Sequence, residues 1–89
     1  MPYVYAEQRA NLFTEEGQRM FLKVRDAAKK LIGQAGVVRV DKLMGHAGTG
    51  DSWDMLACAD RMVELGELHE IPNTISSAGQ HRLFTTFDQ

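Results

Sequence analysis

Residues 50–68, GDSWDMLACADRMVELGEL, contain the clearest helical pattern of the chain. Apolar residues recur there at three- and four-residue steps, the period of one helix face: Met55, Leu56, Ala59, Met62, Val63 and Gly66. Asp51 or Ser52 can cap the start, and Asp54 lies in the first turn, where the helix dipole favours a negative charge. The sequence therefore predicts a helix that buries one face and leads directly into a strand. The other side chains fall on a different face: Trp53, Ala57, Asp60, Arg61 and Glu64.

Length and composition restrict the class of protein. Eighty-nine residues make one small domain with a thin core, and a net charge of −2 provides no general attraction to nucleic acid or anionic membranes. No apolar run approaches the ~20 residues that span a bilayer, so no membrane partner is expected. Cys58 has no second cysteine to pair with, which fits a cytoplasmic location, and we expect a small buried thiol.

The first part of the chain divides into an N-terminal arm, residues 1–13, and the start of a domain that covers residues 14–89. Tyr3 and Tyr5 make the arm aromatic, so it is expected to pack on its own domain or on a partner subunit. A helix is predicted from Thr14 to Gln34, with Thr14 as its cap. Leu22 falls opposite the apolar stripe of this helix. A thin core, an aromatic arm and this leucine together suggest a homodimer.

Shorter elements follow the first helix. A β-branched strand, Val37–Val40, precedes a short helix, Lys42–Ala47, which Asp41 can cap and which buries Leu43 and Met44. After the long helix, we predict strands at Leu68–Ile71 and His81–Phe87. In the second of these, Leu83, Thr85 and Phe87 share one side. The expected core is Phe21, Val24, Leu31, Leu56, Val63 and Leu83.

This order of elements resembles the winged-helix family. The likeness is carried by residues 37–71, VVRVDKLMGHAGTGDSWDMLACADRMVELGELHEI, and residues 79–87, GQHRLFTTF. It implies an α+β winged helix-turn-helix domain, with three helices, a small antiparallel sheet and a β-hairpin wing. The phrase RMVELGEL is similar to the family's usual end of the recognition helix, where a glycine lets the chain turn into the wing.

The resemblance implies double-stranded DNA as a partner and a role in transcription regulation. The family commonly inserts its long helix into the major groove and touches the backbone with the wing. Hydroxyl, amide and basic side chains at the matching positions would face phosphates or base edges. Carried over to this chain, the nucleic-acid-binding residues are Lys42, Thr49, Ser52, Trp53, Ala57, Arg61, Gln80, His81 and Arg82.

The charge distribution favours a second hypothesis. Residues 37–89 contain four basic and eight acidic side chains, whereas residues 1–36 contain six basic and four acidic ones. Because phosphate neutralisation supplies most non-specific DNA affinity, the presumed reading half would repel DNA. The alternative is a winged helix that binds a protein partner through the long-helix face around Trp53. In that case Trp53 is an exposed anchor, whereas otherwise its ring packs over the short helix or under the wing.

No motif in the sequence indicates an enzyme. His46, His69, His81 and Cys58 form no close pair of the kind that binds zinc. The loop GHAGTGD, residues 45–51, lacks the Gly-Lys-Ser/Thr ending of a phosphate-binding loop. We therefore expect no catalytic residues, no metal and no cofactor.

Overall fold

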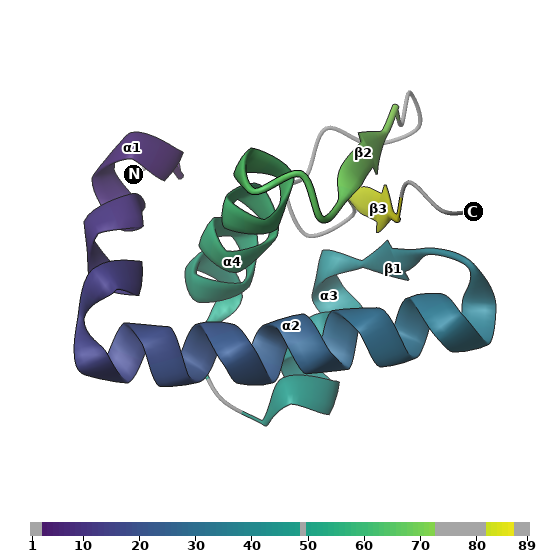
Figure 1. Cartoon of the computed structure of the whole chain (residues 1–89), viewed down its shortest axis with the longest axis horizontal. Coiled ribbons are helices and arrows are strands. Elements are labelled where there is room, and N and C mark those ends of the chain that lie inside the picture. The colour runs from purple at the N-terminus through teal and green to yellow at the C-terminus, as the bar shows by residue number, and fades with distance from the viewer. Residues whose placement is uncertain (1–2, 49, 73–81, 87–89) are drawn as a thin grey trace.

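The chain folds into a mostly helical α+β structure with one small antiparallel sheet, as a computed structural model shows (Figure 1). This confirms the predicted α+β class. The structure describes residues 3–48, 50–72 and 82–86. Its elements, in chain order, are α1 (Tyr5–Gln8), the 3-10 helix η1 (Arg9–Phe13), α2 (Glu15–Ala35), β1 (Val38–Arg39), α3 (Val40–Ala47), α4 (Ser52–Glu64), β2 (His69–Ile71) and β3 (Leu83–Thr85).

The helix ends follow local signals. The Thr14 side chain accepts a hydrogen bond from the Gly17 N–H at 3.0 Å and caps α2, as predicted. Asp51, not Ser52, caps α4: its side chain accepts from the Asp54 N–H, and the Asp54 side chain accepts from the Asp51 N–H, which completes a capping box.

Helix α4 ends at a glycine, also as predicted. Gly66 has a φ of +78°, a left-handed conformation that costs glycine little. The N–H groups of Gly66 and Glu67 bond the carbonyls of Val63 and Met62, at 3.0 and 2.9 Å, and so satisfy the last turn of α4. The chain then leads into β2.

Helix α3 differs from its prediction. It begins at Val40 rather than Lys42, so Asp41 lies within the first turn and does not precede the helix as a cap. Leu43 is fully buried as expected. The side chain of Met44 lies outside what the structure describes.

The sheet has the strand order β1-β3-β2, and both pairings are antiparallel. Phe84 in the central strand pairs with Val38 and Glu70 and is fully buried. The sequence had placed the core side of this strand on Leu83, which is only partly buried. Thr85 is buried, and its hydroxyl is satisfied because it donates to the Gly36 carbonyl at 2.7 Å. Phe87 lies outside the described residues.

The core lies where α2, α3, α4 and the sheet meet. Val24, Leu56 and the Cys58 thiol are buried as predicted, while Phe21 and Leu31 are partly buried against the core. Burial, with a smaller effect of nearby Asp54, raises the pKa of the Cys58 thiol to about 12.

Two predictions for α4 were wrong. Ala57, predicted to face DNA, is buried, and Val63, predicted to join the core, is 38% exposed. Ala57 is buried because several elements surround this helix: η1, α1, α2 and α3 all contact it. A helix that is packed on several sides buries a wider arc than a single amphipathic stripe.

The N-terminal arm packs on its own domain, one of the two placements that the sequence allowed. In Figure 1 the arm, α1 and η1, lies on one side of α4 and the sheet on the other. The arm turns back tightly against α2 at Gly17, where an added Cβ would lie 1.9 Å from the Asn11 carbonyl oxygen. Only glycine permits this approach without movement of the backbone.

Candidate interaction face on helix α4

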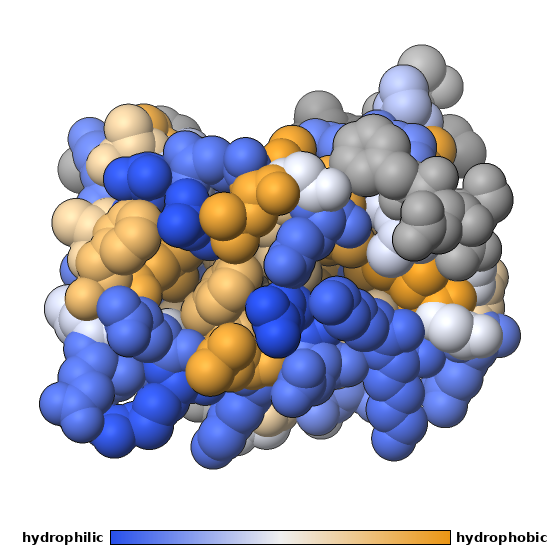
Figure 2. All heavy atoms as spheres, viewed as in Figure 1, coloured by the Kyte–Doolittle hydropathy of each residue, from blue (hydrophilic) through white to orange (hydrophobic). Residues whose placement is uncertain are grey.

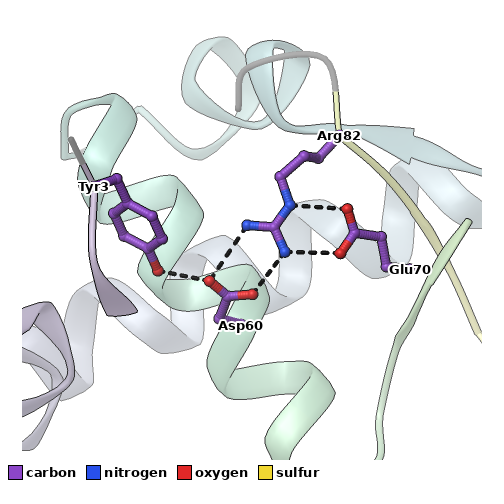
Figure 3. A network of polar contacts seen from close by, with 4 residues as sticks. All are labelled: Tyr3, Asp60, Glu70 and Arg82. Atoms are coloured by element: carbon purple, nitrogen blue, oxygen red, sulfur yellow. Dashed lines mark hydrogen bonds and ion pairs between the residues drawn. The ribbon is translucent and has the colours of Figure 1, made fainter. Parts of the chain in front are cut away.

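The side of α4 that faces the arm carries two groups of polar contacts. We call it the α4 outer face and define it by Trp53, Asp60, Arg61 and Glu64. In the first group, drawn in Figure 3, the Tyr3 hydroxyl donates to Asp60 at 2.7 Å, and Arg82 donates to both Asp60 oxygens at 2.8 and 3.3 Å. Asp60 therefore links the arm to the residue that precedes β3.

Arg82 lies between two carboxylates. Besides Asp60, its guanidinium donates two hydrogen bonds to Glu70, at 2.8 and 2.9 Å (Figure 3). The hydrogen bonds to Glu70 contribute most to raising the pKa of Arg82. Burial, followed by the hydrogen bond to Asp60, raises the pKa of Tyr3. Both side chains are held in the protonated form that donates these bonds.

The second group gathers on Glu64, one helical turn beyond Asp60. Glu64 accepts hydrogen bonds from Arg61 at 2.6 Å, from the Tyr5 hydroxyl at 2.9 Å and from Arg9 at 3.0 and 3.1 Å. These donors, Arg61 first, lower the pKa of Glu64 to about 2. The guanidinium carbons of Arg9 and Arg61 also lie 4.8 and 5.0 Å from the centroid of the Phe13 ring.

Trp53 is partly buried and packs against the core. Its ring meets the Tyr3 ring edge-on, with the centroids 6.2 Å apart and the planes at 73°. Within the described residues, the arm thus provides an aromatic ring that packs on Trp53. As long as the arm is in place, Trp53 is not the freely exposed anchor that the protein-binding hypothesis required.

Those residues predicted to touch DNA that the structure describes do not form one basic surface. Arg61 and Arg82 both form ion pairs with carboxylates, and Ala57 is buried. Ser52 is the partly buried first residue of α4, while Lys42 is exposed on α3. Thr49, Gln80 and His81 lie outside the described residues.

The arm residues that occupy this face were not predicted from the sequence. Tyr3 and Tyr5 were noted only as aromatic, and Arg9, Glu64 and Glu70 were assigned no role. One local signal existed, because Tyr5 and Arg9, like Asp60 and Glu64, are four residues apart and so share one face of a helix. That signal identifies the two faces but does not show that they meet.

Apolar side chains are exposed beside this face. In Figure 2 they gather in the middle of the view, over α2 and the C-terminal end of α4. The exposed large hydrophobic residues of η1, α2 and the end of α4 are Phe13, Leu22, Val63 and Leu65, between 38% and 49% exposed. Leu22 is exposed as predicted, and the homodimer that it suggested stays a prediction.

An open hollow of about 460 Å³ lies where the starts of α2 and α4 approach each other. Its polar lining includes Thr14 and Asp54, and both side chains already serve as helix caps. Glu16 adds a negative charge at the rim. Among the polar side chains that line this hollow, only Asn11 and the exposed Glu16 are not used as helix caps.

Comparisons of the chain with known proteins found no relative. No protein-family model, no curated protein and no solved structure matches the chain. Within residues 3–48, 50–72 and 82–86, no three metal-ligating side chains gather, and no helix is long and apolar enough to cross a membrane.

Proposed function

We propose that the chain is a cytoplasmic winged-helix domain without enzymatic activity, which binds a protein partner through the α4 outer face. The order of elements supports the winged-helix assignment. After the arm, one helix, a short strand and two further helices precede two strands, and β1 joins that pair in one antiparallel sheet. This order supports the arrangement that the resemblance in sequence implies.

One observation carries the choice of a protein partner: the α4 outer face already holds a polypeptide segment. Asp60 and Glu64 accept hydrogen bonds from two phenols and one guanidinium of the arm. Aromatic and arginine side chains are the groups that contribute most at protein interfaces. A surface that binds them within the chain has the chemistry to bind them from another protein.

Electrostatics also favour a protein partner over DNA. A phosphate must compete with Glu64 for Arg61, and with Asp60 and Glu70 for Arg82. These carboxylates also repel the DNA backbone, so each contact with phosphate is offset by a repulsion.

Protein capture tests the proposal. Immobilised wild-type chain is treated with a short cross-linker in cell extract, and bound proteins and cross-linked positions are identified by mass spectrometry. We expect a partner cross-linked to α4 whose capture is lost in the double variant Asp60→Asn/Glu64→Gln. The control is Glu15→Gln, which removes an exposed carboxylate that pairs only with Arg19 at 3.2 Å. Capture that is equal in all three baits would contradict the proposal.

DNA binding is the second candidate, favoured by the same order of elements and by the exposed Lys42 on α3. Here Arg61→Ala and Arg82→Ala should weaken binding, and the affinity should fall as salt is raised. The measurement is a gel-shift titration with mixed-sequence duplex at low salt. No shift at ~50 micromolar protein excludes this candidate, because non-specific binders reach that range.

A further inference from the structure

We propose that the N-terminal arm is an internal ligand of the α4 outer face, and that it competes with a helical partner segment presenting a tyrosine and an arginine one turn apart. The inference rests on the proposed function and specifies the chemistry of the partner. It also makes the arm an autoinhibitory element, since the partner must displace it.

The spacing of the contacts defines this chemistry. Tyr5 and Arg9 are four residues apart in a helical stretch and reach the same carboxylate, Glu64. Asp60 and Glu64 are also four residues apart, and Asp60 takes the hydroxyl of Tyr3. Two carboxylates on successive turns of α4 thus receive the donors of one short segment. A partner segment with the same donors satisfies the same acceptors.

The arm is held in a way that permits exchange. Helix α1 contains no buried residue, and in η1 only Leu12 is buried. The ion pair between Arg9 and Glu64 is exposed, with side-chain exposures of 42% and 38%, and exposed pairs of this kind stabilise little. Hydrogen bonds near the surface and the partly buried rings of Tyr3 and Tyr5, rather than fully buried side chains, hold the first part of the arm.

The face itself does not depend on the arm for its shape. Asp60 is also bonded to Arg82, and Glu64 is also bonded to Arg61 within α4. When the arm leaves, both carboxylates keep a partner that holds them in place. The binding site therefore stays formed for the incoming segment.

Trp53 reports the position of the arm. It is the one tryptophan of the sequence, and the Tyr3 ring lies against its ring. Departure of the arm uncovers Trp53, so acrylamide should quench its fluorescence more strongly. The signal needs no label on the protein.

The test compares the full wild-type chain with the triple variant Tyr3→Phe/Tyr5→Phe/Arg9→Gln. The Phe substitutions keep both aromatic rings and Gln keeps an uncharged polar side chain, but the hydroxyl and guanidinium donors to Asp60 and Glu64 are removed. The probe is a fluorescent peptide that copies residues 3–13, YVYAEQRANLF, and the control peptide carries the same three substitutions. Arg19→Gln, on the exposed part of α2, is the control variant of the chain.

We expect the copied peptide to bind the triple variant at least about tenfold more tightly than the wild type, because the tethered arm competes at a high effective concentration. Trp53 should be quenched more strongly in the triple variant, and the peptide should reverse this. The control peptide should bind neither chain. Circular dichroism establishes that both chains are equally folded.

Two results would overturn the inference: equal peptide affinity for both chains, or unchanged Trp53 quenching in the triple variant. Either can occur while the cross-linking experiment still maps a partner to α4, and then the proposed function stands without the competing arm. If instead the peptide binds as expected but no protein is captured at α4, the arm is a ligand of this face and the proposed function fails.

Discussion

The two sides of α4 are held by different forces. The inner side, represented by Met55, Leu56 and Met62, is apolar and at most 5% exposed. The outer side, represented by Asp60 and Glu64, is held to the arm by hydrogen bonds and ion pairs. Burial of apolar area does not depend on pH, whereas hydrogen bonds to carboxylates do. The inner side thus provides stability, whereas the contact on the outer side depends on the protonation of its carboxylates.

The largest expected effect lies on the inner side. Leu56→Ala should lower the free energy of unfolding by about 2–5 kcal/mol, because it leaves a cavity in the core. Val63→Ala, on the same helix but 38% exposed, should cost less than about 1 kcal/mol. The measurement is a pair of denaturant titrations. Equal losses would mean that the two sides of α4 do not differ as described.

An intermediate effect is expected where the arm meets α2. Gly17→Ala should cost about 1–3 kcal/mol, because its Cβ would collide with the Asn11 carbonyl and force the arm away. Gly33→Ala is the matched control in the same helix. Its Cβ meets nothing within 4 Å, so the change should be neutral or stabilise by up to about 1 kcal/mol.

Denaturant titration gives both free energies of unfolding, and acrylamide quenching of Trp53 shows whether the arm has moved. Increased quenching in Gly17→Ala but not in Gly33→Ala is the expected pattern. A Gly17→Ala chain as stable as the wild type would show that the arm does not pack closely on α2.

The smallest effect should appear on acidification. The pKa of Glu64 is lowered to about 2 in the folded chain, against an ordinary value of about 4.3. A lowered carboxyl pKa means that the contribution of Glu64 is fully present above about pH 4.5 and is lost as the pH falls towards 2. Arm docking should weaken over this range, and Trp53 quenching should rise.

Glu64→Gln separates this effect from general acid unfolding. The variant should show increased quenching already at neutral pH and a smaller further change between pH 5 and 2. Glu15→Gln removes an exposed carboxylate of α2 away from the arm contacts, so Trp53 quenching in this variant should depend on pH as in the wild type. If Trp53 quenching in Glu64→Gln changed between pH 5 and 2 as it does in the wild type, the transition would belong to groups other than Glu64.

Several features were predictable because their signals are local. Thr14 and Asp51 cap helices through bonds to residues three positions away, and Gly66 ends α4 through bonds within five residues. Burial of Cys58 was also predicted correctly. The side of β3 that faces the core was not predicted correctly. A strand of three residues that pairs on both sides has too few positions to show which side faces the core.

The sequence by itself determined the two long helices, the Thr14 cap and the α+β class, and it narrowed the cap of α4 to Asp51 or Ser52, since these depend on periodicity and on contacts between near neighbours. Only the tertiary structure decided what the outer face of α4 does. Tyr3 meets Asp60 across 57 positions of the chain, and Tyr5 meets Glu64 across 59. No local pattern encodes which of several exposed carboxylates such a donor will choose. That choice follows from the fold, which turns the arm back at Gly17 and places it along α4.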